Sequence, residues 1–229
     1  ENYVGMSGGP DKSLPATLGT GVVFESAATS IIGCTFDSNS NRIVISYRDD
    51  ANSDYGTAVV GTVSGTSISF GTPVVFESAA YSQANEGITF DSNSNKVVIA
   101  YVDNGNSGHG TAIVGTVSGT SISFGSPTVF EASLNVAGTS TTFDSNANKV
   151  VISFSDAAAG NYGTAIVGTV SGTSISFGTP TVFESASTSQ ISSTFDSNLN
   201  KVVIAYRDNG NSVYGTAIVG TVSNTSISF

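Results

Sequence analysis

The sequence has little of what most enzymes use for catalysis. It contains one cysteine, Cys34, one histidine, His109, and no tryptophan. A single cysteine excludes an intramolecular disulfide, and the lack of Cys and His clusters argues against zinc sites and thiol chemistry. A nucleophile paired with a base would have few possible members, and no Gly-x-Ser-x-Gly turn is present. We therefore expect a protein that is not an enzyme and holds no metal or other cofactor.

Charge is also scarce, and what there is has an acidic balance. Only 10% of residues are charged, and the formal net charge is -10. A basic stripe for a polyanion is missing, so nucleic acid is not an expected partner. There is no apolar run of 18 or more residues, and Glu1–Pro15 does not read as a signal peptide, so membrane insertion is not expected. Abundant Ser, Thr, Asn and Gly with few lysines favour an extracellular or virion-surface location.

What the sequence does contain is an internal repeat of about 53 residues. The segment Val-Phe-Glu recurs at intervals of 52, 54 and 53 residues, at Phe24, Phe76, Phe130 and Phe183. The distance from Thr-Phe-Asp-Ser-Asn to Ser-Ile-Ser-Phe is 34 residues in each copy, whereas the distance from Val-Phe-Glu to Thr-Phe-Asp-Ser-Asn runs 12, 14, 13 and 12. Copies without linkers are expected to share a continuous core, and all length variation falls in one connection.

Each copy is predicted to contain four antiparallel strands, A to D. Strands B and C are β-branched and apolar on both faces, as in strands covered on both sides. Pro73, Pro127 and Pro180 place strand D at the sheet edge, because proline cannot donate to a strand ladder. In the second copy the expected strands are Ile88–Asp91, Lys96–Asp103, Thr111–Val117 and Ser121–Glu131.

The order Phe-Asp, polar turn, Val-Val-Ile-Ala-Tyr, Asp, then Gly-Thr-Ala-Ile-Val-Gly-Thr-Val resembles the blades of tryptophan-aspartate repeat propellers and of lectin or sialidase-type propellers. The resemblance covers nearly the whole chain, although the tryptophan and the Gly-His pair of such blades are missing. The block Gly-Thr-Val-Ser-Gly-Thr-Ser-Ile-Ser-Phe-Gly is also similar to repeats in large surface or virion proteins of marine bacteria and phages. The predicted fold is all-β, a four-bladed β-propeller of four-stranded antiparallel blades.

The two chain ends are expected to complete one blade together. Phe229 holds the position of Phe70, and the counterpart of the following residue, Gly71, is Gly19. Residues 19–229 therefore form the predicted repeat domain, with residues 19–25 completing the last blade and residues 1–18 as an N-terminal extension. The ring would be closed by strands from both termini. The alternative is a fragment cut from a longer array.

The connections of a propeller blade sort onto two sides of the molecule. The D–A and B–C connections share one side, here named the loop side, and the A–B and C–D turns share the other. The A–B and C–D turns hardly change among the copies. The D–A connections vary freely; they are Ala27–Thr35, Ser78–Thr89, Ala132–Thr142 and Ser185–Thr194. Because loops on a rigid scaffold commonly carry recognition, the loop side is the candidate binding surface.

Each B–C connection starts at an aspartate and ends at an aromatic or imidazole side chain before a glycine. Such rings can stack on a sugar face, while carboxylates and amides take its hydroxyl groups. The candidate ligand-binding residues are Tyr55, His109, Tyr162, Tyr214, Asp49, Asp103, Asp156, Asp208 and, in a D–A connection, Tyr81. The alternative is that the rings cap apolar space between blades. His109 is interpreted as a variant of the aromatic position and not as a catalytic base.

Two sets of acidic residues could suggest cation binding. The pattern Asp-x-Asn-x-Asn resembles the start of a calcium loop but lacks its Gly and distant Glu, so we interpret it as a turn in which Asp bonds the backbone; it begins at Asp37, Asp91, Asp144 and Asp196. The other possible cation sites are the carboxylates of the Val-Phe-Glu segments, Glu25, Glu77, Glu131 and Glu184.

The sequence therefore favours a non-enzymatic recognition module that binds glycans or a cell surface through up to four similar sites on the loop side. The alternative is a structural or assembly protein, such as a filament or virion appendage subunit, whose loop side contacts neighbouring subunits.

Overall fold

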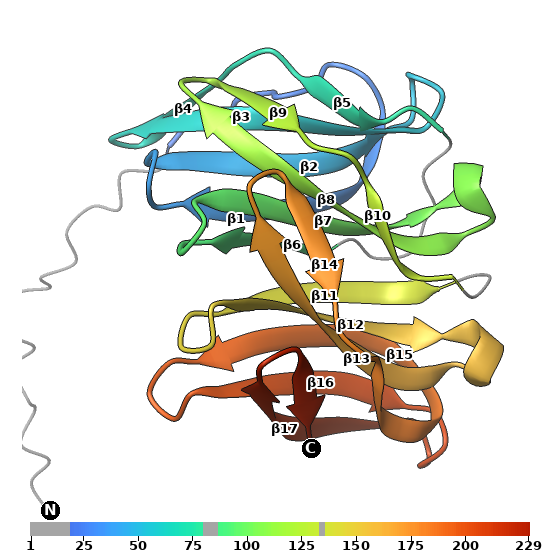
Figure 1. The fold of residues 1–229 in the computed structure, drawn as a ribbon. Coiled ribbons are helices and arrows are strands. Elements are labelled where there is room, and N and C mark those ends of the chain that lie inside the picture. The colour runs from blue at the N-terminus through green and yellow to red at the C-terminus, as the bar shows by residue number, and fades with distance from the viewer. Residues whose placement is uncertain (1–18, 80–86, 133–135) are drawn as a thin grey trace, which may run out of the picture.

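The computed structural model describes residues 19–79, 87–132 and 136–229, and in these residues the chain is built from antiparallel strands (Figure 1). The exceptions are two single-turn 3₁₀ helices, η1 (Asn104–Asn106) and η2 (Ala157–Ala159). Within the described residues neither helix approaches the length needed to cross a bilayer. The all-β prediction is confirmed.

The strands fall into four units in chain order. Unit 1 has β1 (Thr29–Asp37), β2 (Arg42–Asp49), β3 (Tyr55–Ser64), β4 (Ser67–Phe70) and β5 (Val74–Glu77). Unit 2 has β6 (Gly87–Asp91), β7 (Lys96–Asp103), β8 (His109–Ser118), β9 (Ser121–Phe124) and β10 (Thr128–Glu131). Unit 3 has β11 (Ala137–Asp144), β12 (Lys149–Asp156), β13 (Tyr162–Ser171), β14 (Ser174–Phe177) and the start of β15 (Thr181–Asp196). Unit 4 has the end of β15, β16 (Lys201–Asp208), β17 (Tyr214–Ser223) and β18 (Ser226–Ser228).

Within a unit, strands A, B and C are consecutive neighbours, as predicted. Strand D differs from the prediction, because in unit 2 it is two short strands, β9 and β10, that both pair with β8. The interruption has a physical cause at Gly125 and Pro127. Pro127 has no N–H for the ladder, and Gly125 lies directly against the backbone carbonyl of Thr173 in the next unit. The chain is therefore drawn from its own sheet toward the following one.

The A–B turns are held by their aspartates, as the sequence predicted. In unit 3, Oδ1 of Asp144 accepts hydrogen bonds from the N–H groups of Asn146 (2.9 Å) and Ala147 (2.8 Å). The last residue of the turn, Asn148, has a left-handed backbone with φ 54°, which asparagine tolerates. The other three turns bond in the same way, through Asp37, Asp91 and Asp196.

The hydrophobic core lies between units and not within them. Each of three clusters combines buried side chains of one unit with buried side chains of the unit that follows it in the chain. Between units 2 and 3, for example, Ala112 and Val114 of β8 pack with Ile152 and Phe154 of β12. Since a unit buries its faces only by contact with neighbours, the array is stabilised mainly by its inter-unit contacts.

The Val-Phe-Glu segments join consecutive units. Phe130 ends unit 2 but packs against two rings of unit 3, Phe154 at 5.2 Å and Phe177 at 5.8 Å between ring centroids. Phe76 and Phe183 make the equivalent contacts at the other junctions. The repeated motif therefore encodes the junction between copies.

The expected ring closure by both termini is corrected by the structure. The units follow one another from unit 1 at the top of Figure 1 to unit 4 at the bottom, and no sheet of the described residues closes. Residues 19–25 rest on unit 1, where Phe24 packs against Tyr47 (5.2 Å) and Phe70 (5.9 Å), and they do not pair with β17. The packing at the three junctions sets how each unit is placed on the one before it. After four units, the first and the last unit do not meet. A closed four-bladed propeller is not confirmed.

Candidate functional site

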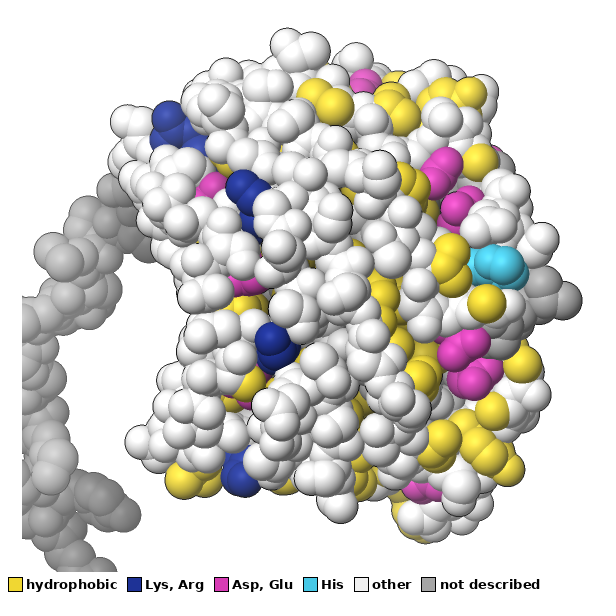
Figure 2. Space-filling view, viewed as in Figure 1, with side chains coloured by type: hydrophobic (Ala, Val, Ile, Leu, Met, Phe, Trp, Pro, Cys, Tyr) yellow, Lys and Arg dark blue, Asp and Glu magenta, His cyan; other side chains and the backbone are white. Residues whose placement is uncertain are grey.

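The two sides of the array differ in charge. Figure 2 shows a row of Lys and Arg side chains on one side, while many of the Asp and Glu side chains and the histidine gather on the opposite side. Each A–B turn is followed by a basic residue that begins strand B: Arg42, Lys96, Lys149 or Lys201. The acids include those of the B–C connections, so the loop side is the more acidic and varied one.

The predicted aspartates hold their own loops in shape. Asp103 Oδ1 accepts a hydrogen bond from the Asn106 N–H (3.0 Å), and Asp208 Oδ1 accepts from the Gly210 and Asn211 N–H groups (both 3.0 Å). Asp49 accepts from the Asn52 N–H, and Asp156 from the Ala158 and Ala159 N–H groups. One carboxylate oxygen of each is thus committed to the loop backbone.

The predicted aromatic residues all stand at the same place in successive units. Tyr55, His109, Tyr162 and Tyr214 each begin strand C and pair with the aspartate that ends strand B. Tyr214 is 61% exposed, while the other three are half-buried. They therefore form a row along the loop side. The remaining candidate, Tyr81, lies outside the described residues.

The loop side is hollowed between units 3 and 4. A groove of about 410 Å³ lies there, lined almost entirely by small, hydroxyl and amide side chains: Ala137, Gly138, Ser155, Asn161, Ser187, Thr188, Ser189, Gln190 and Asn209. Tyr162 pairs with Ser187 of its wall. None of the sequence-predicted site residues lines the groove; Tyr162 is next to it along the strand ladder, through its pairing with Ser187.

The groove contains an ordered polar network. The Asn209 Nδ2 donates to Ser187 Oγ and Ser189 Oγ, both at 3.3 Å, and Ser155 Oγ donates to the Asn161 carbonyl at 3.2 Å. Sequence reasoning did not single out these residues, although Ser187 and Ser189 belong to a variable D–A connection. Their shared ability to donate and accept hydrogen bonds suits a polyhydroxylated ligand.

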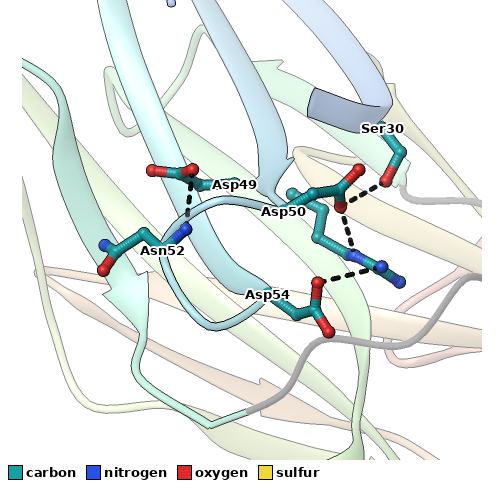
Figure 3. Close-up of polar contacts among 6 residues, drawn as sticks. Ser30, Asp49, Asp50, Asn52 and Asp54 are labelled. Atoms are coloured by element: carbon teal, nitrogen blue, oxygen red, sulfur yellow. Dashed lines mark hydrogen bonds and ion pairs between the residues drawn. The ribbon is translucent and has the colours of Figure 1, made fainter. Parts of the chain in front are cut away.

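The B–C loop of unit 1 is held by ion pairs between its own residues. Arg48 forms ion pairs with Asp50 (2.6 Å) and Asp54 (3.0 Å), and Ser30 Oγ donates to Asp50 at 2.8 Å (Figure 3). The guanidinium is therefore already paired with carboxylates. It is poorly suited to capture an anionic ligand.

The alternative cation sites at the Val-Phe-Glu carboxylates are disfavoured by their hydrogen bonds. Glu77 Oε2 accepts from the Tyr101 hydroxyl (3.0 Å) of the next unit, and its Oε1 accepts from the Ala79 N–H (2.8 Å). Glu25 and Glu184 bond Tyr47 and Tyr206 in the same way. Within the described part of the chain, no three His, Cys, Asp or Glu side chains are grouped to hold a metal. Glu77 and Glu184 therefore act as inter-unit clamps, and Glu25 holds residues 19–25 against unit 1.

The clamps predict sensitivity to alkaline pH. Burial, together with the hydrogen bond and charge of Glu184, raises the pKa of Tyr206 from 10.0 to about 12, and burial followed by Glu77 raises the pKa of Tyr101 further. Below pH 10 these phenols are neutral in both the folded and the unfolded chain, so the free energy of unfolding does not change. Above pH 10 the phenols ionise first in the unfolded chain, and this lowers the free energy of unfolding. We expect the unfolding free energy to fall above pH 10.

This fall should be smaller in Y101F/Y206F, measured by urea unfolding from pH 8 to 11. The matched control is Tyr55→Phe, which removes a phenol outside the clamps. An equal alkaline fall in all three proteins would contradict the role of the clamps.

Comparisons with known proteins assign no family to this chain. No family model matches the chain, and no curated protein matches it. Among solved structures, a point mutant of Aleuria aurantia lectin in complex with Fucalpha1-6GlcNAc is similar, with 14% identity and a TM-score of 0.44. The match covers 82% of this chain and 56% of the lectin chain, so this chain spans little more than half of that protein. A likeness of this degree assigns neither ligand nor activity.

Proposed function

We propose that this chain is a non-enzymatic recognition module that binds glycans, as carried on cell surfaces, through its loop side. The observation that supports this most is the groove between units 3 and 4, whose wall is made of hydroxyl and amide groups. Its volume of about 410 Å³ lies within the range of small-molecule sites. Neutral, densely placed donors and acceptors match sugar hydroxyls better than they match an ionic ligand.

Tyr162 supplies the apolar part of the proposed site. Its backbone partner in the strand ladder, Ser187, lines the groove. A half-buried ring of this kind can stack against the apolar face of a pyranose. Similar residues at the other junctions would give several weak sites, whose joint binding raises affinity for a multivalent surface. The proposal places the protein outside the cell or on a virion surface.

The test is a glycan array followed by titration calorimetry with the best glycan. We expect Asn209→Ala and Tyr162→Ala each to weaken binding about five- to tenfold, since a lost hydrogen-bond set or stacking contact is worth roughly 1–1.5 kcal/mol. Asn198→Ala is the matched control, because Asn198 is an exposed asparagine on the opposite side. No bound glycan, or binding that all three variants retain equally, would refute the proposal.

The alternative function, subunit assembly through the loop side, predicts a different result. Concentration-dependent particles in light scattering that Tyr162→Ala abolishes, with no glycan bound, would favour it.

A further inference from the structure

The groove on the loop side lies at a position that recurs at each junction between units. The residue before strand C has a left-handed backbone at all three junctions, with φ 61° at Asp54, 74° at Gly108 and 64° at Asn161. At the second and third junctions its carbonyl accepts a hydrogen bond from an N–H group of the next unit. Gly108 accepts from Val136 (3.3 Å), and Asn161 accepts from Thr188 (2.8 Å). The backbone is therefore alike, and the side chains decide what each junction offers to a ligand.

The first two junctions differ from the groove in their chemistry. Between units 2 and 3, Val102 and Val136 are 3% and 2% exposed and belong to the hydrophobic core. Between units 1 and 2, the counterpart of Val102 is Arg48, because both pair with the second residue of strand C. Arg48 forms ion pairs with Asp50 and Asp54. One junction is thus apolar at this position, and the other is charged.

At the junction between units 3 and 4, hydroxyl residues take the places of the two valines. Ser155 holds the strand position of Val102, and Thr188 makes the backbone hydrogen bond that Val136 makes. Ser155 and Thr188 are 2% and 3% exposed, and yet both line the groove. Because they are buried, they form its deepest part. We name Ser155 and Thr188 the groove floor.

Both hydroxyl groups of the groove floor have already used their protons. Ser155 Oγ donates to the Asn161 carbonyl at 3.2 Å, and Thr188 Oγ1 donates to the same carbonyl at 3.3 Å. A carbonyl oxygen can only accept, and a hydroxyl group has one hydrogen, so the lone pairs of both hydroxyl oxygens remain for a donor. Among the described residues, neither oxygen accepts a hydrogen bond. The groove floor therefore offers acceptors and asks for a donor from the ligand.

The surroundings of the groove are unfavourable for an anion. No lysine, arginine or histidine is among the residues that line it. The Asn209 Nδ2 has two hydrogens, and it donates them to Ser187 and Ser189. The strand-end residues next to the groove in units 3 and 4 are the aspartates Asp156 and Asp208. A carboxylate or sulfate group would lose its hydration there without gaining a cation as partner.

We propose that the groove binds an uncharged sugar through a hydroxyl group that donates to Ser155 and Thr188, and that these two residues determine its selection against acidic sugars. This inference rests on the glycan recognition proposed above and names the class of sugar. A sugar hydroxyl satisfies the acceptors of the groove floor, whereas an ionised carboxylate has no proton to give. A site built to hydrogen-bond a hydroxyl group also rejects analogues that lack it, because its buried polar groups are then left unpaired.

The first experiment tests whether the sugar donates a proton to the groove floor. The probes are the methyl glycoside of the terminal sugar of the best array glycan and its monodeoxy and monofluoro analogues, titrated by calorimetry. Fluorine cannot donate a hydrogen bond. At one ring position we therefore expect both analogues to bind the wild-type chain about fivefold more weakly than the parent sugar, the usual effect of one hydrogen bond.

The variant S155A/T188V removes both acceptors and keeps the backbone hydrogen bond of residue 188. It should bind the parent sugar and both analogues alike, at the weaker affinity. Thr164→Val is the matched control: Thr164 is 2% exposed and also donates to a backbone carbonyl, that of Tyr162 at 3.4 Å, but it does not line the groove. It should keep the wild-type difference between the parent sugar and its analogues.

Two results of this titration would overturn the inference. One is a wild-type chain for which fluorination weakens binding at no ring position, a result that does not depend on how well the double variant folds. The other is a difference between parent sugar and analogues that persists in S155A/T188V.

The second experiment compares neutral glycans on the array with the same glycans ending in a carboxylated sugar. We expect the acidic versions to bind at least about fivefold more weakly, because a buried charge without a partner is costly. Equal binding of both versions would overturn the inference and leave the proposed glycan recognition standing. A wild-type chain that binds no glycan would overturn both.

Discussion

Replacing Phe130 by alanine is expected to lower the unfolding free energy by about 3–5 kcal/mol, the usual cost of removing a buried aromatic ring. Phe130 is 6% exposed and is the ring through which unit 2 contacts Phe154 and Phe177 of unit 3. Its loss would also uncover Gly110, whose Cα fits against the ring. Because this core joins two units, the substitution should weaken the array at its middle junction.

The matched control for this prediction is Phe24→Ala. Phe24 makes the same pair of ring contacts at unit 1, but it is less buried, and no strand C of the described residues lies behind it. Urea unfolding followed by far-UV circular dichroism should show a clearly smaller loss for Phe24→Ala. If Phe130→Ala and Phe24→Ala lost the same unfolding free energy, the stability of a junction would not depend on having a sheet on both sides of the phenylalanine ring.

Gly110→Ala is the second change with a large expected effect, although it adds only one methyl group. The added Cβ would lie 2.5 Å from Phe130 Cε2 and 2.6 Å from Cζ. The ring cannot turn aside without losing its packing against Phe154, so we expect a destabilisation of about 1–3 kcal/mol, as for other overpacked cores.

The equivalent change in unit 4, Gly215→Ala, separates steric clash from any general effect of replacing this glycine. Nothing lies within 4 Å of the position that its Cβ would take, so the melting temperature of the monomer should not fall. A comparable loss of stability in both variants would show that backbone freedom, and not the Phe130 ring, requires glycine here.

Much of the local structure follows from residues that are close in sequence. Asp144 with Asn148 specifies a tight turn because the carboxylate bonds the backbone within three residues and asparagine tolerates a left-handed backbone. Lys96–Asp103 specifies a buried strand because its side chains are apolar on both faces. Strand D was predicted less well, since its interruption depends on contact between Gly125 and a carbonyl of the next unit.

The site was only partly predictable. The variable connections identified the loop side, and Tyr162 was singled out from its place before a glycine. The groove itself joins Ser155 and Asn161 of unit 3 with Asn209 of unit 4, which come together only when two units pack. The loop-entry aspartates were predicted as ligand groups, but their carboxylates each bond a loop N–H, which no spacing rule reveals.

The sequence alone determined the number of copies, strands A to C and the A–B turns, because each depends on a pattern repeated within about 53 residues. Only the tertiary structure decided whether the copies close on themselves. That outcome depends on the angle between packed units, which is set jointly by side chains of two copies such as Phe130 and Phe154.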